Sequence, residues 1–157
     1  NQEELFVSAM NRDLGVKQGS HIKPRNVKAK SKKSDILKRI AYIYTVKGDV
    51  ASAESNYKAI IAINPNDVET YMDLAYVKLD KKKEIADKMA LLGTSAEDMK
   101  KYDELKIKKD EEVKVAVGYL EKALTLEPSN KDISKLLLNL YRSLDMTDKY
   151  EALKAKG

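Results

Sequence analysis

Apolar residues between positions 34 and 63 recur at intervals of three and four, the spacing of one face of an α-helix. The pattern is interrupted at Gly48 and stops at Pro65. Glycine commonly ends a helix, and proline cannot continue one. The segment 34–67 is therefore predicted to form two antiparallel helices joined by a short turn.

The same pattern begins again after Pro65, this time with a long insertion in its middle. Its first half lies at Tyr71, Leu74 and Ala75. Its second half returns only much later, at Ala116, Leu120, Ala123 and Pro128. The sequence thus predicts a second helix pair whose two helices are separated by inserted residues.

A third and shorter copy of the pattern follows. Its apolar positions are Ile133, Leu137, Leu138 and Tyr141, followed by a turn at Asp145 and a closing helix over Lys149–Lys156. Leu138 stands where the earlier copies have a small residue, so packing in this copy is expected to differ. The predicted units are residues 34–67, residues 68–130 with an insertion over about 81–109, and a partial unit over 131–157.

The first unit resembles the tetratricopeptide repeat (TPR), a helix–turn–helix motif of 34 residues. Small residues at Ala41 and Ala53 allow two helices to approach closely, while Tyr44 and Tyr57 fill the remaining space. The positions that carry the resemblance are Leu37, Ile40, Ala41, Tyr44, Gly48, Ala53, Tyr57 and Pro65. The resemblance implies an all-α, TPR-like α-solenoid over 34–157, similar to bacterial repeat proteins that have one enlarged repeat.

The insertion is predicted to be helical on both sides of Gly93, with Thr94 or Ser95 capping the second helix. The simplest arrangement extends both helices of the second unit into a long antiparallel hairpin. Ile85 would then lie opposite Tyr102.

This hairpin is expected to have a polar neck and an apolar tip. In the neck, Lys81–Lys83 would lie opposite Glu104–Lys106, near the acids at 110–112. The hairpin tip consists of Ile85, Met89, Leu91, Leu92, Met99 and Tyr102. A coiled-coil seam explains these apolar residues, and any apolar surface beyond that seam would be a docking surface.

The net charge of +5 belongs to the N-terminal arm. Residues 1–33 carry eight Lys and Arg against three Asp and Glu, whereas residues 34–157 carry 22 of each sign. Residues 15–33 contain no acid and few apolar residues, which favours a basic flexible linker. The alternative is a contact for phosphates or an acidic surface. No Phe, Tyr or Trp lies among the basic residues, so nucleic-acid binding is not favoured.

A short amphipathic helix is predicted over residues 1–14. The apolar residues on its one face are Leu5, Phe6, Ala9, Met10 and Leu14. A flexible linker would let this helix reach a binding groove on its own chain or on a second copy. Self-association by exchange of this N-terminal helix is therefore one expected mode of assembly.

The sequence contains no recognisable set of catalytic residues. The chain has no Cys and a single His, His21 in the linker, which disfavours thiolate, zinc and triad chemistry. It has no Gly-rich phosphate loop and no nucleophile elbow. The acids Glu111 and Glu112 lie among lysines, which is typical of a solvated, salt-paired helix face. The sequence thus predicts no catalytic, cofactor or metal site, and a protein that is not an enzyme.

The resemblance also implies a binding site. In TPR proteins the first helices of successive repeats line a concave groove that holds a peptide or a partner helix. Carried over to this chain, the groove residues are Lys38, Tyr42, Thr45, Met72, Tyr76, Leu79, Lys135, Asn139 and Arg142. The apolar middle of this set suits an amphipathic helix, and its basic ends would favour acidic flanks on the ligand. The expected function is a non-catalytic scaffold that binds a protein or peptide.

Three alternatives remain open from the sequence. The groove positions are also what an ordinary small helical domain exposes. The basic arm would serve a nucleic-acid or acidic-surface binder, and the hairpin tip would serve a self-assembling structural component. No apolar run is long enough to span a membrane, and the absence of Cys fits a bacterial periplasm or envelope as well as a cytoplasm.

Overall fold

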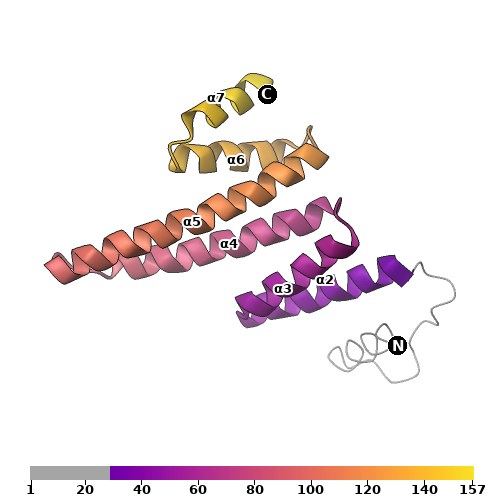
Figure 1. The fold of residues 1–157 in the computed structure, drawn as a ribbon, viewed down its shortest axis with the longest axis horizontal. Coiled ribbons are helices and arrows are strands. Elements are labelled where there is room, and N and C mark those ends of the chain that lie inside the picture. The colour runs from indigo at the N-terminus through magenta and orange to yellow at the C-terminus, as the bar shows by residue number, and fades with distance from the viewer. Residues whose placement is uncertain (1–28) are drawn as a thin grey trace. The chain divides into compact units, whose positions relative to one another are not determined.

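The computed structural model describes residues 29–157, and every regular element in this range is an α-helix (Figure 1). The helices are α2 (Ala29–Lys47), α3 (Val50–Ile63), α4 (Val68–Ala90), α5 (Ala96–Leu126), α6 (Lys131–Ser143) and α7 (Thr147–Lys156). The described residues divide into two compact units, the first ending at Thr70 and the second spanning residues 71–157. The all-α class and the TPR-like helix pairs expected from the sequence are confirmed for this part of the chain.

The predicted N-terminal helix over 1–14 and His21 lie outside the described residues. Helix α2 begins at Ala29, so the last residues of the expected linker are helical. Alanine and lysine are good helix formers, and no Gly or Pro interrupts residues 29–33.

The first unit contains the antiparallel pair α2 and α3, joined by a turn at Gly48. Gly48 has a φ of 77°, in the left-handed region that glycine adopts without steric cost. Asp49 then caps α3, because its Oδ1 accepts the backbone N–H of Ser52 at 3.1 Å. Helix α3 ends at Ile63, ahead of Pro65. Both helix ends predicted within the first repeat, at Gly48 and before Pro65, are therefore present.

Small side chains lie where the helices of the first repeat come closest. Ala41 on α2 and Ala53 on α3 are completely buried, and Tyr57 and Ile60 are buried on the same face of α3. Tyr44 is half-buried. The packing role predicted for the two alanines and for Tyr57 is consistent with this burial.

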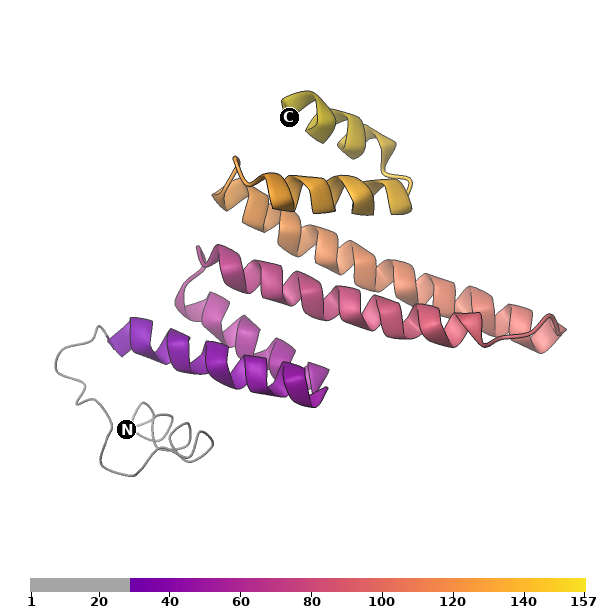
Figure 2. The same cartoon turned by 180° about the vertical axis from the view of Figure 1, so that it is seen from behind.

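In the second unit, α4 and α5 run side by side as a long hairpin, seen from both sides in Figures 1 and 2. Ser95 caps α5 by accepting the backbone N–H of Asp98 at 3.1 Å. Asp98 in turn accepts the N–H of Gly93 at 3.2 Å, through Oδ2. A Cβ at position 93 would lie 2.9 Å from that oxygen, so glycine allows the close turn. Of the two predicted caps, the structure uses Ser95.

Helix α6 packs against α5, and α7 packs against α6. The buried residues of α6 are Ile133, Leu137, Leu140 and Tyr141. Leu138, which replaces a small residue of the repeat, is half-buried. The turn before α7 is at Asp145, as predicted, and this residue has a φ of 55°. Helix α7 itself has no buried residue.

None of the helices in residues 29–157 combines the length and the apolar content that a membrane crossing requires.

We expect the close contact at Ala53 to be intolerant of added volume. Ala53→Leu should destabilise the first unit by about 1–3 kcal/mol, because the side chain has no space between α2 and α3. Ala62→Leu, at an exposed position of the same helix, is the matched control and should change stability little. Urea unfolding followed by circular dichroism measures both. Equal stability of the two variants would contradict the close approach of α2 and α3.

Candidate protein-interaction surfaces

The outer face of α2 carries large apolar side chains in solvent. Tyr42 is 65% exposed, and Val46, one helical turn later, is also exposed. Thr45 lies beside them, and its hydroxyl donates to the carbonyl of Ala41 at 2.9 Å. Tyr42 and Thr45 are thus accessible on the helix where the resemblance places the groove. Val46 was not singled out in the sequence, although its i, i+4 spacing from Tyr42 indicates the same face.

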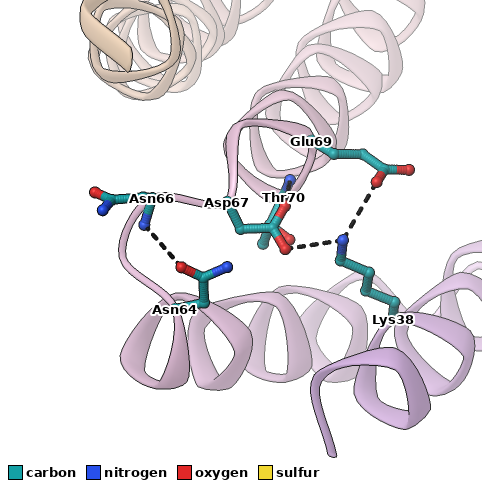
Figure 3. Close-up of polar contacts among 6 residues, drawn as sticks. All are labelled: Lys38, Asn64, Asn66, Asp67, Glu69 and Thr70. Carbon is teal, nitrogen blue, oxygen red and sulfur yellow. Dashed lines mark hydrogen bonds and ion pairs between the residues drawn. The ribbon is translucent and has the colours of Figure 1, made fainter. Parts of the chain in front are cut away.

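Lys38, the fourth residue of interest on α2, is held by two carboxylates (Figure 3). Its Nζ lies 2.8 Å from Asp67 Oδ2 and 3.2 Å from Glu69 Oε2. Asp67 also accepts the backbone N–H of Thr70 at 3.1 Å, so it joins α2 to the start of α4. The charge of Lys38 is therefore already matched within the first unit. The expected attraction of Lys38 for an acidic flank of a ligand is weakened accordingly.

This environment changes the titration of Lys38. Partial burial lowers the pKa of its ammonium, but hydrogen bonds and charge attraction from Asp67 and Glu69 outweigh that effect and raise the pKa above its usual value. The ammonium is thus fixed in its charged form by these contacts over the physiological range.

The expected groove residues of α4 differ in accessibility. Tyr76 is 47% exposed, whereas Met72 and Leu79 are half-buried. Tyr76 follows Tyr42 by 34 residues, which is the length of one repeat. The first helices of two successive repeats therefore carry an exposed tyrosine at the same repeat position.

The expected groove residues of α6 are polar and exposed. Lys135 and Asn139 lie on the surface of the helix. Arg142 contacts α7, because its Nη2 donates to the Tyr150 hydroxyl at 2.7 Å and its guanidinium lies 5.1 Å from that ring. Arg142 is thus already involved in a contact within the second unit.

The neck of the hairpin contains an ion-pair cluster around Glu112. Lys78 Nζ lies 3.4 Å from Glu112 Oε2, and Lys81 Nζ lies 3.6 Å from Glu112 Oε1. Glu111 is exposed, as expected, whereas Glu112 is salt-paired as expected but is largely buried together with Lys78 and is not solvated. Lys81 thus lies near the acids at 110–112, as the sequence predicted. The turn at 91–95 sets a register in which α4 lysines contact Glu112.

The hairpin tip is divided between a buried seam and an exposed patch. Ile85 and Met89 are buried, and Leu92 is half-buried. The exposed side chains are Leu91 (87%), Met99 (61%) and Tyr102 (47%). The seam therefore accounts for only part of the tip, and apolar surface beyond it remains in solvent.

A polar cluster joins α5, α6 and α7. The hydroxyl of Tyr141 donates to Glu121 Oε1 at 2.8 Å, and Lys149 Nζ lies 2.7 Å from the same oxygen. Burial and the hydrogen bond to Glu121 raise the pKa of Tyr141, so the phenol stays protonated as a donor. The sequence pattern did not predict this cluster, although a core tyrosine requires an acceptor for its hydroxyl.

Among the described residues, no group of three or more His, Cys, Asp and Glu side chains could hold a metal ion. Among the acids in ion pairs, Asp67, Glu112 and Glu121 each face lysine. These surfaces can bind by apolar contact and ion pairing.

Comparison with known proteins leaves the family open. No protein-family model matches the chain, and no curated protein matches it significantly. Among solved structures it is similar to a MamA protein at 25% identity and a TM-score of 0.32, over 80% of this chain and 72% of that one. It is similar at 16% identity and a TM-score of 0.35 to MamA from Desulfovibrio magneticus RS-1, over 99% of this chain and 93% of that one. An ArsTM double mutant of RS-1 MamA has the same identity and TM-score, over 99% and 90%. At these TM-scores the likeness assigns neither a family nor a function.

We expect the stabilisation by Lys38 to depend on alkaline pH. Because the pKa of Lys38 in the folded chain lies above the ordinary 10.5, its contribution is complete below that pH and is lost as the pH rises through the raised pKa. The thermal unfolding midpoints of the natural chain and Lys38→Met should therefore differ most below pH 10.5 and converge as the pH rises above it. Lys38→Arg keeps its charge over this range, so its difference in midpoint from Lys38→Met should not change with pH. A difference between the natural chain and Lys38→Met that stays constant with pH would argue against the ion pairs.

We expect Glu112 to matter far more than its neighbour. Glu112→Gln removes the carboxylate charge that Lys78 and Lys81 contact at a largely buried position, and should cost about 1–3 kcal/mol of stability. Glu111→Gln, at an exposed position one residue earlier, should change stability by less than about 0.5 kcal/mol. Urea unfolding of the two variants side by side measures the difference. If both variants unfold like the natural chain, Glu112 does not hold the hairpin neck.

Proposed function

We propose that this chain is a non-catalytic scaffold, in the style of bacterial repeat proteins with an enlarged second repeat. Its partner, a protein or peptide, contacts the first helices of the repeats. The single observation that carries the proposal is the pair of exposed tyrosines at one repeat position, Tyr42 on α2 and Tyr76 on α4. Tyr42 lies in the first compact unit and Tyr76 in the second, and each is proposed as a contact within its own unit.

Tyrosine is well suited to such a contact. Its ring offers a large apolar area with few rotatable bonds, and its hydroxyl finds a polar partner at the edge. Tyrosine is enriched among the residues that dominate binding energy in protein interfaces. Of the other repeat tyrosines, Tyr57, Tyr71 and Tyr141 are buried and Tyr44 is half-buried, so core packing does not explain the exposure of Tyr42 and Tyr76.

The neighbours of these tyrosines indicate what the partner presents. Val46 and Thr45 flank Tyr42, and Met72 and Leu79 flank Tyr76 at helical spacing. Because Lys38 is neutralised by Asp67 and Glu69, attraction of an acidic ligand is a minor contribution at α2. The proposal is therefore recognition by apolar and aromatic contact, as an amphipathic helix would offer.

The hairpin tip supports a second candidate function. Leu91, Met99 and Tyr102 expose apolar area where the hairpin turns. A structural component that assembles through this tip would use these residues and leave Tyr42 and Tyr76 unused. Both surfaces expose tyrosine, so the same Tyr→Ala substitution can be made on each. The two functions can therefore be separated by mutation.

The expected effect of removing the repeat tyrosines is a loss of partner binding. Photo-crosslinking from a benzoylphenylalanine at position 42 or 76 of the full chain identifies the partner, which is then purified. The double variant Tyr42→Ala/Tyr76→Ala should bind it at least about tenfold more weakly, as expected when interface tyrosines are truncated. Calorimetry with the purified partner gives this ratio.

Tyr102→Ala is the matched control, because Tyr102 is as exposed as Tyr76 but lies in the hairpin tip. It should leave the affinity unchanged. If Tyr102→Ala weakens binding and the double variant does not, the hairpin tip is the binding surface and the proposal is wrong. Binding that survives in both variants but disappears on removal of residues 1–28 would assign the function to the basic arm.

A further inference from the structure

Helix α7 is attached to the second unit without an apolar anchor. None of its ten residues is buried, and Tyr150 and Leu153 are only half-buried. A helix of this length is marginal by itself, since isolated helices need about 12–15 residues to be stable in water. No side chain caps its first turn. The helical form of α7 therefore depends on the surface that it contacts.

The contacts that hold α7 are directional and charged. Lys149 Nζ bonds Glu121 Oε1 on α5 at 2.7 Å and lies 5.8 Å from the centre of the Tyr141 ring on α6. Arg142 on α6 donates to the Tyr150 hydroxyl at 2.7 Å. The docking surface of α7 thus consists of Glu121, Tyr141 and Arg142, two of which contact the same lysine. An occupant must present a lysine and a tyrosine in adjacent positions of a helix, as residues 149–150 do.

The turn between α6 and α7 is short and strained. Only Leu144, Asp145 and Met146 separate the two helices. Asp145 has a φ of 55°, and a left-handed conformation costs an L-residue roughly 1–2 kcal/mol, less for Asp than for most. Backbone bonds from Asp145 to Arg142 (3.2 Å) and from Met146 to Tyr141 (2.8 Å) keep the turn closed. Opening the turn would relieve the strained φ.

We propose that α7 is exchanged between two copies of this chain, so that Lys149 and Tyr150 of one copy dock on Glu121, Tyr141 and Arg142 of the other. Every contact of α7 is re-formed in the exchanged pair, and short strained hinges favour such exchange. This surface is separate from Tyr42, Tyr76 and the hairpin tip, so the proposal does not depend on the proposed function. A short hinge gives α7 a high effective concentration at its own site. The single chain therefore dominates when dilute, and exchange appears at hundreds of micromolar or where copies gather.

Charge reversal tests the exchange. Glu121→Lys and Lys149→Glu each remove the ion pair from their own chain, so each variant alone should be monomeric with fast amide exchange over residues 147–156. In an exchanged pair of the two variants, one docking site has the natural pair and the other has the same pair with its charges reversed. Mixing them at hundreds of micromolar should give a species of twice the mass by light scattering. Amide protection of α7 should return in the mixture.

The matched control is the double variant Glu121→Lys/Lys149→Glu, which restores the pair within one chain. When dilute, it should be monomeric with α7 protected, as the natural chain should be. A mixture of the single variants that stays monomeric overturns the proposal, and so does a double variant whose α7 remains unprotected, because the ion pair would then not hold α7.

A change in the hinge gives an independent readout. Asp145→Gly adopts a positive φ without strain and should lower the apparent dimer affinity of the mixed variants severalfold. Asp145→Pro cannot adopt that φ and also loses the N–H that bonds Arg142, so it should raise the affinity severalfold. Affinity that is the same with Gly and Pro, or that changes in the opposite order, would rule out opening of this turn.

Discussion

Alanine side chains allow the paired helices to approach closely, and the rest of the structure depends on that approach. Ala41 and Ala53 in the first repeat, and Ala75, Ala116 and Ala123 in the second unit, have no exposed surface. Larger neighbours such as Leu74 and Leu120 fill the space that the small residues leave. Because the inner faces are closely packed, the side chains left for other proteins are those on the outer faces. Tyr42 and Tyr76 are among these side chains on the outer faces.

The hairpin neck illustrates a different constraint. Lys78 and Glu112 lie between apolar residues of the hairpin base, such as Leu74 and Val113, and those of its tip, such as Ile85. A charged pair at such a position adds little net stability compared with apolar residues, yet it penalises any alignment that separates the two charges. In this hairpin it favours one register of α4 against α5.

Local rules made much of the fold predictable from the sequence. Gly48 and Pro65 end helices for backbone reasons that need no knowledge of the surroundings, and the turns at Gly93 and Asp145 follow similarly. The buried alanines were predictable because their spacing repeats. What depends on the meeting of distant side chains was missed, including Glu112 with Lys78, and Glu121 with Tyr141 and Lys149.

The candidate surfaces were predictable to a smaller extent. Tyr42 and Tyr76 were found from their repeat position and are exposed. The charge attraction expected at Lys38 was overestimated. Asp67 caps α4 and pairs with Lys38, which its position in a loop of the sequence did not indicate. At the hairpin tip, periodicity could not separate the buried Met89 from the exposed Met99, because both fit an apolar stripe. Accessibility depends on where a partner helix ends, and a periodic pattern does not contain that information.

The turn at Gly93 also sets an order of events for the folding chain. The contact between Gly93 and Asp98 closes a loop of only a few residues, whereas the contact between Lys78 and Glu112 joins residues much farther apart. The entropy lost in closing a loop increases with its length, so the hairpin should nucleate at the turn and zip towards its base. Zipping should slow at Lys78 and Glu112, where two charges must leave water before the next apolar layer forms. The slowest step in forming the hairpin is thus expected in its neck, away from the turn at which it starts.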